Sequence, residues 1–230
     1  MTISGQGVSK PSGETQSFIV ACAGYSYKNS QLQFIKSANA GGENVSYTVE
    51  PATPEGYGGG VLGFSDKASA GSAVFTVRTG AGTPPKHNST VGAKVRFADS
   101  TTAANATFVI YGSTSLTDGD TFGNVVFHQV ATASLAMFIN KGGTVAAGDG
   151  GNTQFYNNST AANAVFHNEG GIAYGQTYTL KGGKVVPKMG KDGPKYQGAT
   201  AATLPLMGRR VEPTARSTIM QLQKRGRTAV

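Results

Sequence analysis

The stretch FYNNSTAANAVFHNEGG, residues 155–171, holds the pattern that the rest of the chain repeats. It contains two phenylalanines eleven positions apart, Phe155 and Phe166, with Ala161 and Ala164 between them. The same frame occurs three times upstream, at Phe64/Phe75, Phe97/Phe108 and Phe127/Phe138. The first phenylalanines of the four copies lie 33, 30 and 28 residues apart, so a constant motif is joined by connections of variable length. Such a repeat is typical of a solenoid.

Alternation of residue types predicts two short strands in each copy. The first strand ends on the first phenylalanine and has a second inward residue two positions earlier, which is Leu62, Val95, Val125 or Thr153. A polar corner follows, and then a second strand whose inward residues in the last copy are Ala164, Phe166 and Asn168. Small alanines beside large rings suit a thin core between two sheets, because facing side chains must interdigitate without voids.

Glycine pairs follow the second strand in the last two copies, at Gly142-Gly143 and Gly170-Gly171. We expect these pairs to form turns with positive φ, which glycine adopts without a steric penalty. A third short strand is predicted after them, around Thr144-Val145 and Ile172-Ala173.

The repeat therefore predicts an all-β fold, a right-handed parallel β-helix (β-solenoid) of about four to five coils. Neighbouring coils would pair at about 4.8 Å, so that identical positions stack into ladders. Eight of the 11 phenylalanines fall into two such columns, and burying each ring is worth about 1.5–3 kcal/mol. A fainter copy begins at Phe34, with Ala40 and Val45 six and eleven positions later, and is assigned to a degenerate first coil. Asn140 and Asn168 form a third, shorter column.

The predicted organisation has three parts. Residues 1–49 form an N-terminal segment and cap, in which residues 1–16 are loosely ordered, residues 17–23 form a strand and the degenerate coil follows. Residues 50–186 hold the solenoid repeats. Residues 187–230 form a basic and largely irregular extension, with nine Lys/Arg against Asp192 and Glu212, so it accounts for most of the net charge of +8. Within it, residues 214–225 predict a short helix, because they follow Pro213, precede Gly226 and hold Ile219 and Leu222 three positions apart.

Composition excludes several classes of protein. Thirty-three glycines, no Trp and only 14% charged residues disfavour a helical domain. The single Cys22 cannot form an internal disulfide, and its apolar neighbours predict a buried thiol. No secretory signal is recognisable in the polar N-terminal stretch, and no apolar run is long enough to span a membrane, so the sequence leaves the location unknown.

One pair of acidic residues is a weak candidate for a catalytic site. Asp66 and Asp99 each lie two positions after the first phenylalanine of adjacent copies, in a column with Gln129 and Asn157. Stacked carboxylates would repel, raising one pKa or recruiting a cation, and glycoside chemistry uses two carboxylates about 5–9.5 Å apart. The alternative, which the sequence favours, is that they are polar corner residues.

Other catalytic or metal motifs do not stand out. His87, His128 and His167 lack metal-ligand spacing, and His128 is expected to point outward because it directly follows a ladder phenylalanine. Gly58-Gly59-Gly60 lacks the helix that a dinucleotide site requires, so we interpret it as a turn. We therefore expect no metal and no cofactor.

The basic extension has three interpretations: a solubilising tail, a segment that docks on another subunit, and a nucleic-acid contact. Docking is favoured over nucleic acid, because Tyr196 is the only aromatic residue and no stacking platform is present. The candidate partner-binding residues are Arg209, Arg210, Arg216, Ile219, Leu222, Lys224, Arg225 and Arg227.

Two segments resemble a known kind of repeat. Ser159-Thr160-Ala161-Ala162-Asn163-Ala164 and Thr101-Thr102-Ala103-Ala104-Asn105-Ala106 are similar to the Ser-Thr-Ala-x-Asn-Ala repeats of bacterial β-solenoid passengers of the autotransporter and adhesin kind. The corresponding segments at 131–136 and 68–73 lack the Asn. The resemblance covers about residues 60–175 and implies an extracellular or cell-surface protein with a structural or adhesive role.

The repeated positions are all packing and turn residues, which favours a non-enzymatic structural or adhesive solenoid, one subunit of a larger surface or fibrous assembly. Its partners would be other protein subunits or further copies of itself, bound through the solenoid ends and the C-terminal extension. The alternative is a β-helix that binds or cleaves carbohydrate with acidic residues on one sheet face.

Overall fold

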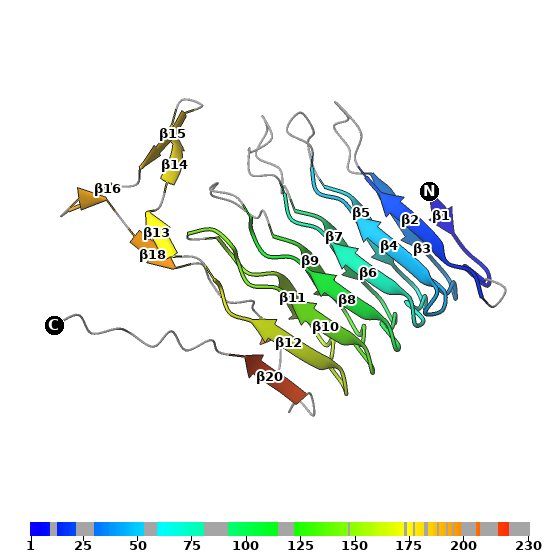
Figure 1. Ribbon diagram of the computed structural model, residues 1–230. Helices are drawn as coiled ribbons and strands as arrows, with labels where there is room; N and C mark the ends of the chain where they lie inside the picture. The colour runs from blue at the N-terminus through cyan, green and yellow to red at the C-terminus, as the bar shows by residue number, and fades with distance from the viewer. Residues whose placement is uncertain are drawn as a thin grey trace.

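The computed structural model is an all-β parallel solenoid (Figure 1). It describes residues 1–9, 13–21, 30–52, 59–80, 92–114, 122–146 and 148–172, and after these 174–176, 178–181, 184–187, 189–191, 193–194, 196–198, 206–207 and 216–220. Beyond residue 172, side chains are described only at 189–191. No helix occurs in these ranges.

Two seven-stranded parallel sheets face each other across the core. The first sheet contains, in spatial order, β1 (Thr2–Ile3), β3 (Gln31–Phe34), β5 (Val61–Phe64), β7 (Lys94–Phe97), β9 (Asn124–Phe127), β11 (Asn152–Tyr156) and β19 (Leu206–Met207). The second contains β2 (Gln16–Val20), β4 (Val45–Val49), β6 (Val74–Val77), β8 (Thr107–Ile110), β10 (Met137–Asn140), β12 (Val165–Glu169) and β20 (Arg216–Met220).

Three small antiparallel pairs lie between β12 and β19 in the chain, and Figure 1 shows them beyond the end of the solenoid. They are β13 (Tyr174–Gln176) with β18 (Tyr196–Gly198), β14 (Tyr178–Lys181) with β15 (Lys184–Pro187), and β16 (Met189–Gly190) with β17 (Gly193–Pro194).

The strand register stacks the phenylalanines into the two predicted columns. In the first column the ring centroids of Phe34, Phe64, Phe97, Phe127 and Phe155 follow one another at 4.5–5.1 Å with nearly parallel planes. The second column contains Phe75, Phe108, Phe138 and Phe166 at 4.7–4.9 Å. Within each coil the two rings meet edge to face, 5.9–6.2 Å apart in the four clear copies, which is a preferred aromatic geometry. The core is therefore a double ladder of rings with buried alanines at the corners.

The second column continues past the residues that the sequence predicted. Tyr47 stacks on Phe75, and Phe18 stacks on Tyr47, both at 5.0 Å. The prediction of Val45 as the second core residue of the degenerate coil is therefore incomplete, because Val45 occupies the position of Ala73 and Tyr47 that of Phe75. Two extra residues in this corner move the ring from the eleventh position to the thirteenth.

Residues 1–9 join the solenoid through β1 and Gly7, contrary to the prediction that residues 1–16 are loosely ordered. β1 pairs with β3, and Gly7 forms a parallel bridge with Asn39. The edge of β3 has backbone N–H and C=O groups that need a partner strand. The N-terminal segment supplies that strand, β1, although it lacks the repeat pattern. The strand predicted at 17–23 is β2, which ends at Val20, and Cys22 lies outside the described residues.

The helix predicted at 214–225 is wrong over residues 216–220, the part of it that the structure describes. Residues Arg216–Met220 form β20, which pairs with β12 in parallel register and places Ser217 beside Phe166 in the second column. The predicted irregular extension thus supplies one strand to each sheet, β19 and β20. The edge of β12 outweighs the weak helical spacing of Ile219 and Leu222, because pairing satisfies a whole row of backbone groups.

Two predictions about the glycine-rich turns are also wrong. None of Gly142, Gly143, Gly170 and Gly171 has a positive φ. Gly142 is required for a different reason, because a Cβ there would lie 2.2 Å from the carbonyl oxygen of Gly170 in the next coil. The third strand predicted after these glycines is not formed either. Thr144 and Ile172 each donate one backbone hydrogen bond to the neighbouring coil, but neither lies in a strand. A third line of parallel bridges runs elsewhere, through Gly7, Asn39, Ser69, Thr102, Thr132 and Thr160 at the corner between the two sheets.

Candidate functional site

The two aspartates of the weak catalytic candidate lie in a turn where the chain leaves the first sheet. Their column comprises Lys36, Asp66, Asp99, Gln129 and Asn157, all with φ between 57° and 60°. Each follows a core phenylalanine by two positions and is the second residue of a β-turn, which the hydrogen bond from Ala68 N–H to Ser65 C=O (3.1 Å) closes in the coil of Asp66. Left-handed backbone favours Asp and Asn over other non-glycine residues, which explains part of this composition.

The side chains of this column form a hydrogen-bond ladder along the solenoid. Asp66 Oδ2 accepts a bond from the Lys36 N–H at 2.7 Å, and Asp99 Oδ2 accepts one from the Asp66 N–H at 2.9 Å. Gln129 Oε1 accepts from the Asp99 N–H at 2.6 Å, while its Nε2 donates to Asp99 Oδ1 at 2.8 Å. Asn157 Oδ1 continues the ladder by accepting from the Gln129 N–H at 3.2 Å.

Each carboxylate therefore satisfies a backbone N–H of the preceding coil, an N–H that the turn leaves without a partner in the sheets. This geometry favours the interpretation of Asp66 and Asp99 as corner residues rather than as an acid and a base. The contribution of each bond is modest, because the bonds are exposed to solvent.

A local turn accounts for the Thr and Ala positions of the Ser-Thr-Ala-x-Asn-Ala pattern. The Thr hydroxyls accept hydrogen bonds from N–H groups two residues later, at 3.0 Å from Ala104 to Thr102 and at 3.1 Å from Ala162 to Thr160. Ala104 and Ala162 have φ of 49° and 47°, a conformation that costs an alanine about 1–2 kcal/mol. The alanines on either side of this strained residue, such as Ala161 and Ala164, point into the core. The Thr hydroxyl thus stabilises a turn by accepting a backbone hydrogen bond, and the Thr and Ala residues of the motif have structural roles.

The predicted asparagine pair is confirmed. Asn140 is completely buried, and its Nδ2 donates to Asn168 Oδ1 at 2.8 Å. Its Oδ1 accepts a hydrogen bond from the Thr153 hydroxyl at 2.9 Å, a contact that the sequence did not predict. Because its amide group bonds on both sides, this small polar cluster is structural.

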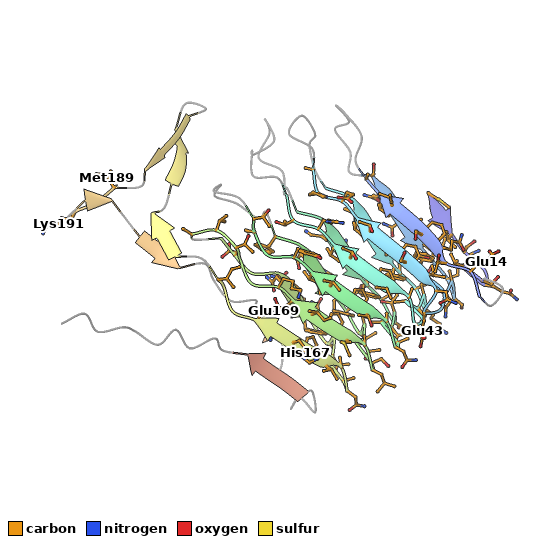
Figure 2. The ribbon with its side chains drawn as sticks, viewed as in Figure 1. Glu14, Glu43, His167, Glu169, Met189 and Lys191 are labelled. Carbon is orange, nitrogen blue, oxygen red and sulfur yellow. The ribbon has the colours of Figure 1, made fainter. Side chains whose placement is uncertain are left out.

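One open groove, of about 690 Å³, lies at the corner next to the coil that starts at Phe34, which has two extra residues there. It is lined by backbone and short polar side chains, among them Asn39, Glu43, Asn44, Ser72 and Asn105. Figure 2 shows Glu43 near the ends where the coils turn, away from His167 and Glu169 on β12. With no aromatic lining residue and one carboxylate, the groove has the means to hydrogen-bond a polar ligand but no catalytic pair.

The outward surface of the first sheet has a different character, and we call it the basic face. It comprises Gln33, Lys94, Arg96, His128, Gln154 and Tyr156, which occupy outward strand positions or directly follow a strand. Arg96 is exposed and the other five are partly exposed, so His128 points outward as predicted. The imidazole of His128 stacks on the Tyr156 ring at 5.1 Å, and partial burial together with the charges of Arg96 and Lys94 lowers its pKa. Sequence reasoning missed this face, although counting alternate positions back from Phe97 identifies Lys94 and Arg96 as outward.

The remaining candidates can be placed only in part. Among the described residues no three His, Cys, Asp or Glu side chains come together as a metal site. Arg216 and Ile219 lie in β20, opposite Val165 and Asn168. The other candidate partner-binding residues of the extension, like His87, lie outside the described ranges.

Within the described residues no helix has the length and apolar character needed to cross a membrane. Comparisons of the chain with protein-family models, with curated proteins and with solved structures find no match.

Proposed function

We propose that this protein is a non-enzymatic structural solenoid that assembles with further copies of itself through the end formed by β1 and β2. The similarity of residues 159–164 to adhesin repeats supports the same role and a location at the cell surface.

The observation behind the proposal is the unpaired edge of β2. This strand is the last member of its sheet in the described part of the chain. Gln16 N–H donates to Asn44 C=O, and Val20 C=O accepts from Glu50 N–H, so the even-numbered residues of β2 face β4. By the alternation of a parallel ladder, Ser17 and Ile19 direct their N–H and C=O groups away from the sheet.

The edge also has none of the features that usually prevent pairing. β2 has the sequence QSFIV, with no charge and no proline, and Ile19 is 72% exposed. Among the described residues, Phe18 ends the second ring column and stacks on one ring, that of Tyr47. An uncharged edge of this kind is a template for another strand. A second copy placed against it would extend both the ladder of backbone bonds and the column of rings.

The test is the oligomeric state of the full chain, measured by light scattering over a range of concentrations and by electron microscopy. Wild-type protein is expected to form dimers or filaments. Ile19→Pro removes an outward-facing N–H without breaking a bond to β4, so it should give a monomer with an unchanged melting temperature. Ile19→Thr keeps the N–H and is the matched control, which should still assemble. A wild-type protein that stays monomeric, or an Ile19→Pro variant that assembles like wild type, would refute the proposal.

Carbohydrate binding is a second candidate function, and the observation that favours it is the basic face. Its neutral amides and cations on a flat sheet can hydrogen-bond sugar hydroxyls and acidic groups. The acidic ladder of Asp66 and Asp99 does not support carbohydrate cleavage, since its carboxylates already accept backbone hydrogen bonds.

A further inference from the structure

The charge of the basic face has no counterpart among the described residues around it. The outward positions of β3, β5, β7, β9 and β11 contain no Asp or Glu. On the second sheet, in contrast, cations are matched by acids of neighbouring coils: Arg78 lies 3.7 Å from Glu50, and Lys141 lies 2.5 Å from Glu169. Among the described residues, Lys94 and Arg96 are therefore cations with no acidic side chain beside them on this sheet face, and a negatively charged partner would complement them.

The same face has a linear arrangement along the solenoid axis. Arg96 is paired with Gly63 on one side and Val126 on the other, and Gln33 and Gln154 lie one coil further out on each side. The Gln33 amide lies over Gly63, since a Cβ at Gly63 would be 2.2 Å from Gln33 Oε1. The Cα positions of Gln33, Arg96 and Gln154 thus form a row, with successive positions two coil spacings, or about 10 Å, apart, and the Gln33 amide reaches over Gly63 towards Arg96. Lys94 flanks this row two residues from Arg96 on the same strand.

A row of neutral amides and fixed cations suits a polymer that bears both hydroxyl and carboxylate groups. Arg96 can bind a carboxylate with two parallel hydrogen bonds, and Lys94 can hold a second anionic group. Gln33 Nε2 donates to Gln31 Oε1 at 3.5 Å, and Gln154 Oε1 accepts from Asn124 Nδ2 at 3.3 Å. An amide has two N–H donors and an oxygen with two lone pairs, so each keeps a donor and an acceptor that hydroxyl groups match. We infer that the basic face binds an acidic polysaccharide lying along the solenoid axis, an inference that rests on the second candidate function above.

The observations favour a polysaccharide over a nucleic acid. Two cations would neutralise about two phosphates, whereas salt-sensitive DNA binding commonly uses about 6–10 such contacts. Single-stranded nucleic acid also needs free aromatic faces for its bases, and one face of Tyr156 is already occupied by His128.

The experiment measures binding of the full chain to polygalacturonate by isothermal titration calorimetry, with methyl-esterified polygalacturonate as the uncharged probe and single-stranded DNA as the competing polyanion. Wild type should bind polygalacturonate more tightly than either probe. Lys94→Gln/Arg96→Gln should weaken binding at least about tenfold, the equivalent of about 1.4 kcal/mol from two exposed charge contacts. Both residues lie on the surface, so the melting temperature should not change.

The matched control is Arg209→Gln/Arg210→Gln, which removes the same charge from the C-terminal extension and should leave the affinity within about threefold. Loss of binding in this control, with retention in Lys94→Gln/Arg96→Gln, would assign polyanion binding to the extension and overturn the inference. Tighter binding of single-stranded DNA would overturn it too. Equal binding of charged and esterified polymers would reject the acidic ligand while keeping carbohydrate binding, and absence of binding to both would reject carbohydrate binding as well.

Discussion

Replacing Phe97 by alanine should remove the most heavily packed ring of the first column. Phe97 is fully buried, lies 4.5 Å from the Phe64 ring and 4.6 Å from the Phe127 ring, and meets Phe108 edge to face at 5.9 Å. Large-to-small changes of a buried Phe cost about 3–5 kcal/mol. Each aromatic pair adds about 0.5–1.5 kcal/mol to the burial of its area, and three pairs are lost, so the upper half of that range is expected. We predict a loss of about 4–5 kcal/mol.

A ring at the end of a column, Phe18, provides the control for the loss of a ring inside a column. Within the described part of the chain Phe18 stacks on one ring, that of Tyr47, and it is partly exposed, so Phe18→Ala should cost about 1–2 kcal/mol. Both values would come from urea denaturation followed by circular dichroism, with the slope of the transition checked for each variant, because solenoids can unfold in parts. Equal losses for the two variants, or a loss below about 2 kcal/mol for Phe97→Ala, would show that stacking within the column does not determine stability.

Four further predictions concern the corners, the second column and the basic face. Tyr47→Phe removes the hydroxyl that donates a buried 2.7 Å hydrogen bond to a backbone carbonyl, so it should lower the unfolding free energy in urea by about 1–3 kcal/mol, and unchanged stability would contradict this. Asp66→Asn keeps an acceptor for the Lys36 N–H and should change stability by less than about 0.5 kcal/mol, whereas a loss of more than about 1 kcal/mol in the same assay would show that the charge matters. Ala162→Gly relieves a positive φ and should be neutral or stabilising by up to about 1 kcal/mol, while Ala164→Gly in the core should destabilise; the opposite order of melting temperatures would refute the strain argument. The lowered pKa of His128 means that the unfolded chain takes up a proton first as the pH falls below about 6.5, so stability should decrease from pH 7 to pH 5 and His128→Gln should flatten that slope in thermal melts; equal slopes would count against it.

The repeat spacing was sufficient to predict the architecture because the core is itself periodic. A ring every coil at a fixed phase leaves few alternatives once the strands are short and parallel, and both columns of Phe64–Phe155 and Phe75–Phe166 follow from it. The same argument reached Phe34, but it failed at Tyr47, where two inserted residues shift the phase and a different aromatic residue takes the position. Periodicity predicts only what is repeated in phase.

For the candidate site, the sequence predicted which residues share a column but not which groups they contact. The chain alone placed Asp66 and Asp99 in one column, since both follow a ladder ring by two positions. It could not show that their oxygens accept the N–H groups of the preceding coil, because those donors come from residues about 30 positions away and from a backbone with positive φ. The effect of the Lys94 and Arg96 charges on His128 of the next coil needed the strand register as well.

By itself the amino-acid sequence determined the all-β solenoid, its two ring columns and the outward or inward direction of most strand residues, because these depend on local alternation and a constant repeat. Only the tertiary structure decided which strands close the ends. β1 and β20 have no repeat pattern of their own, and they are strands because the sheet edges of β3 and β12 offer backbone N–H and C=O groups with which they pair.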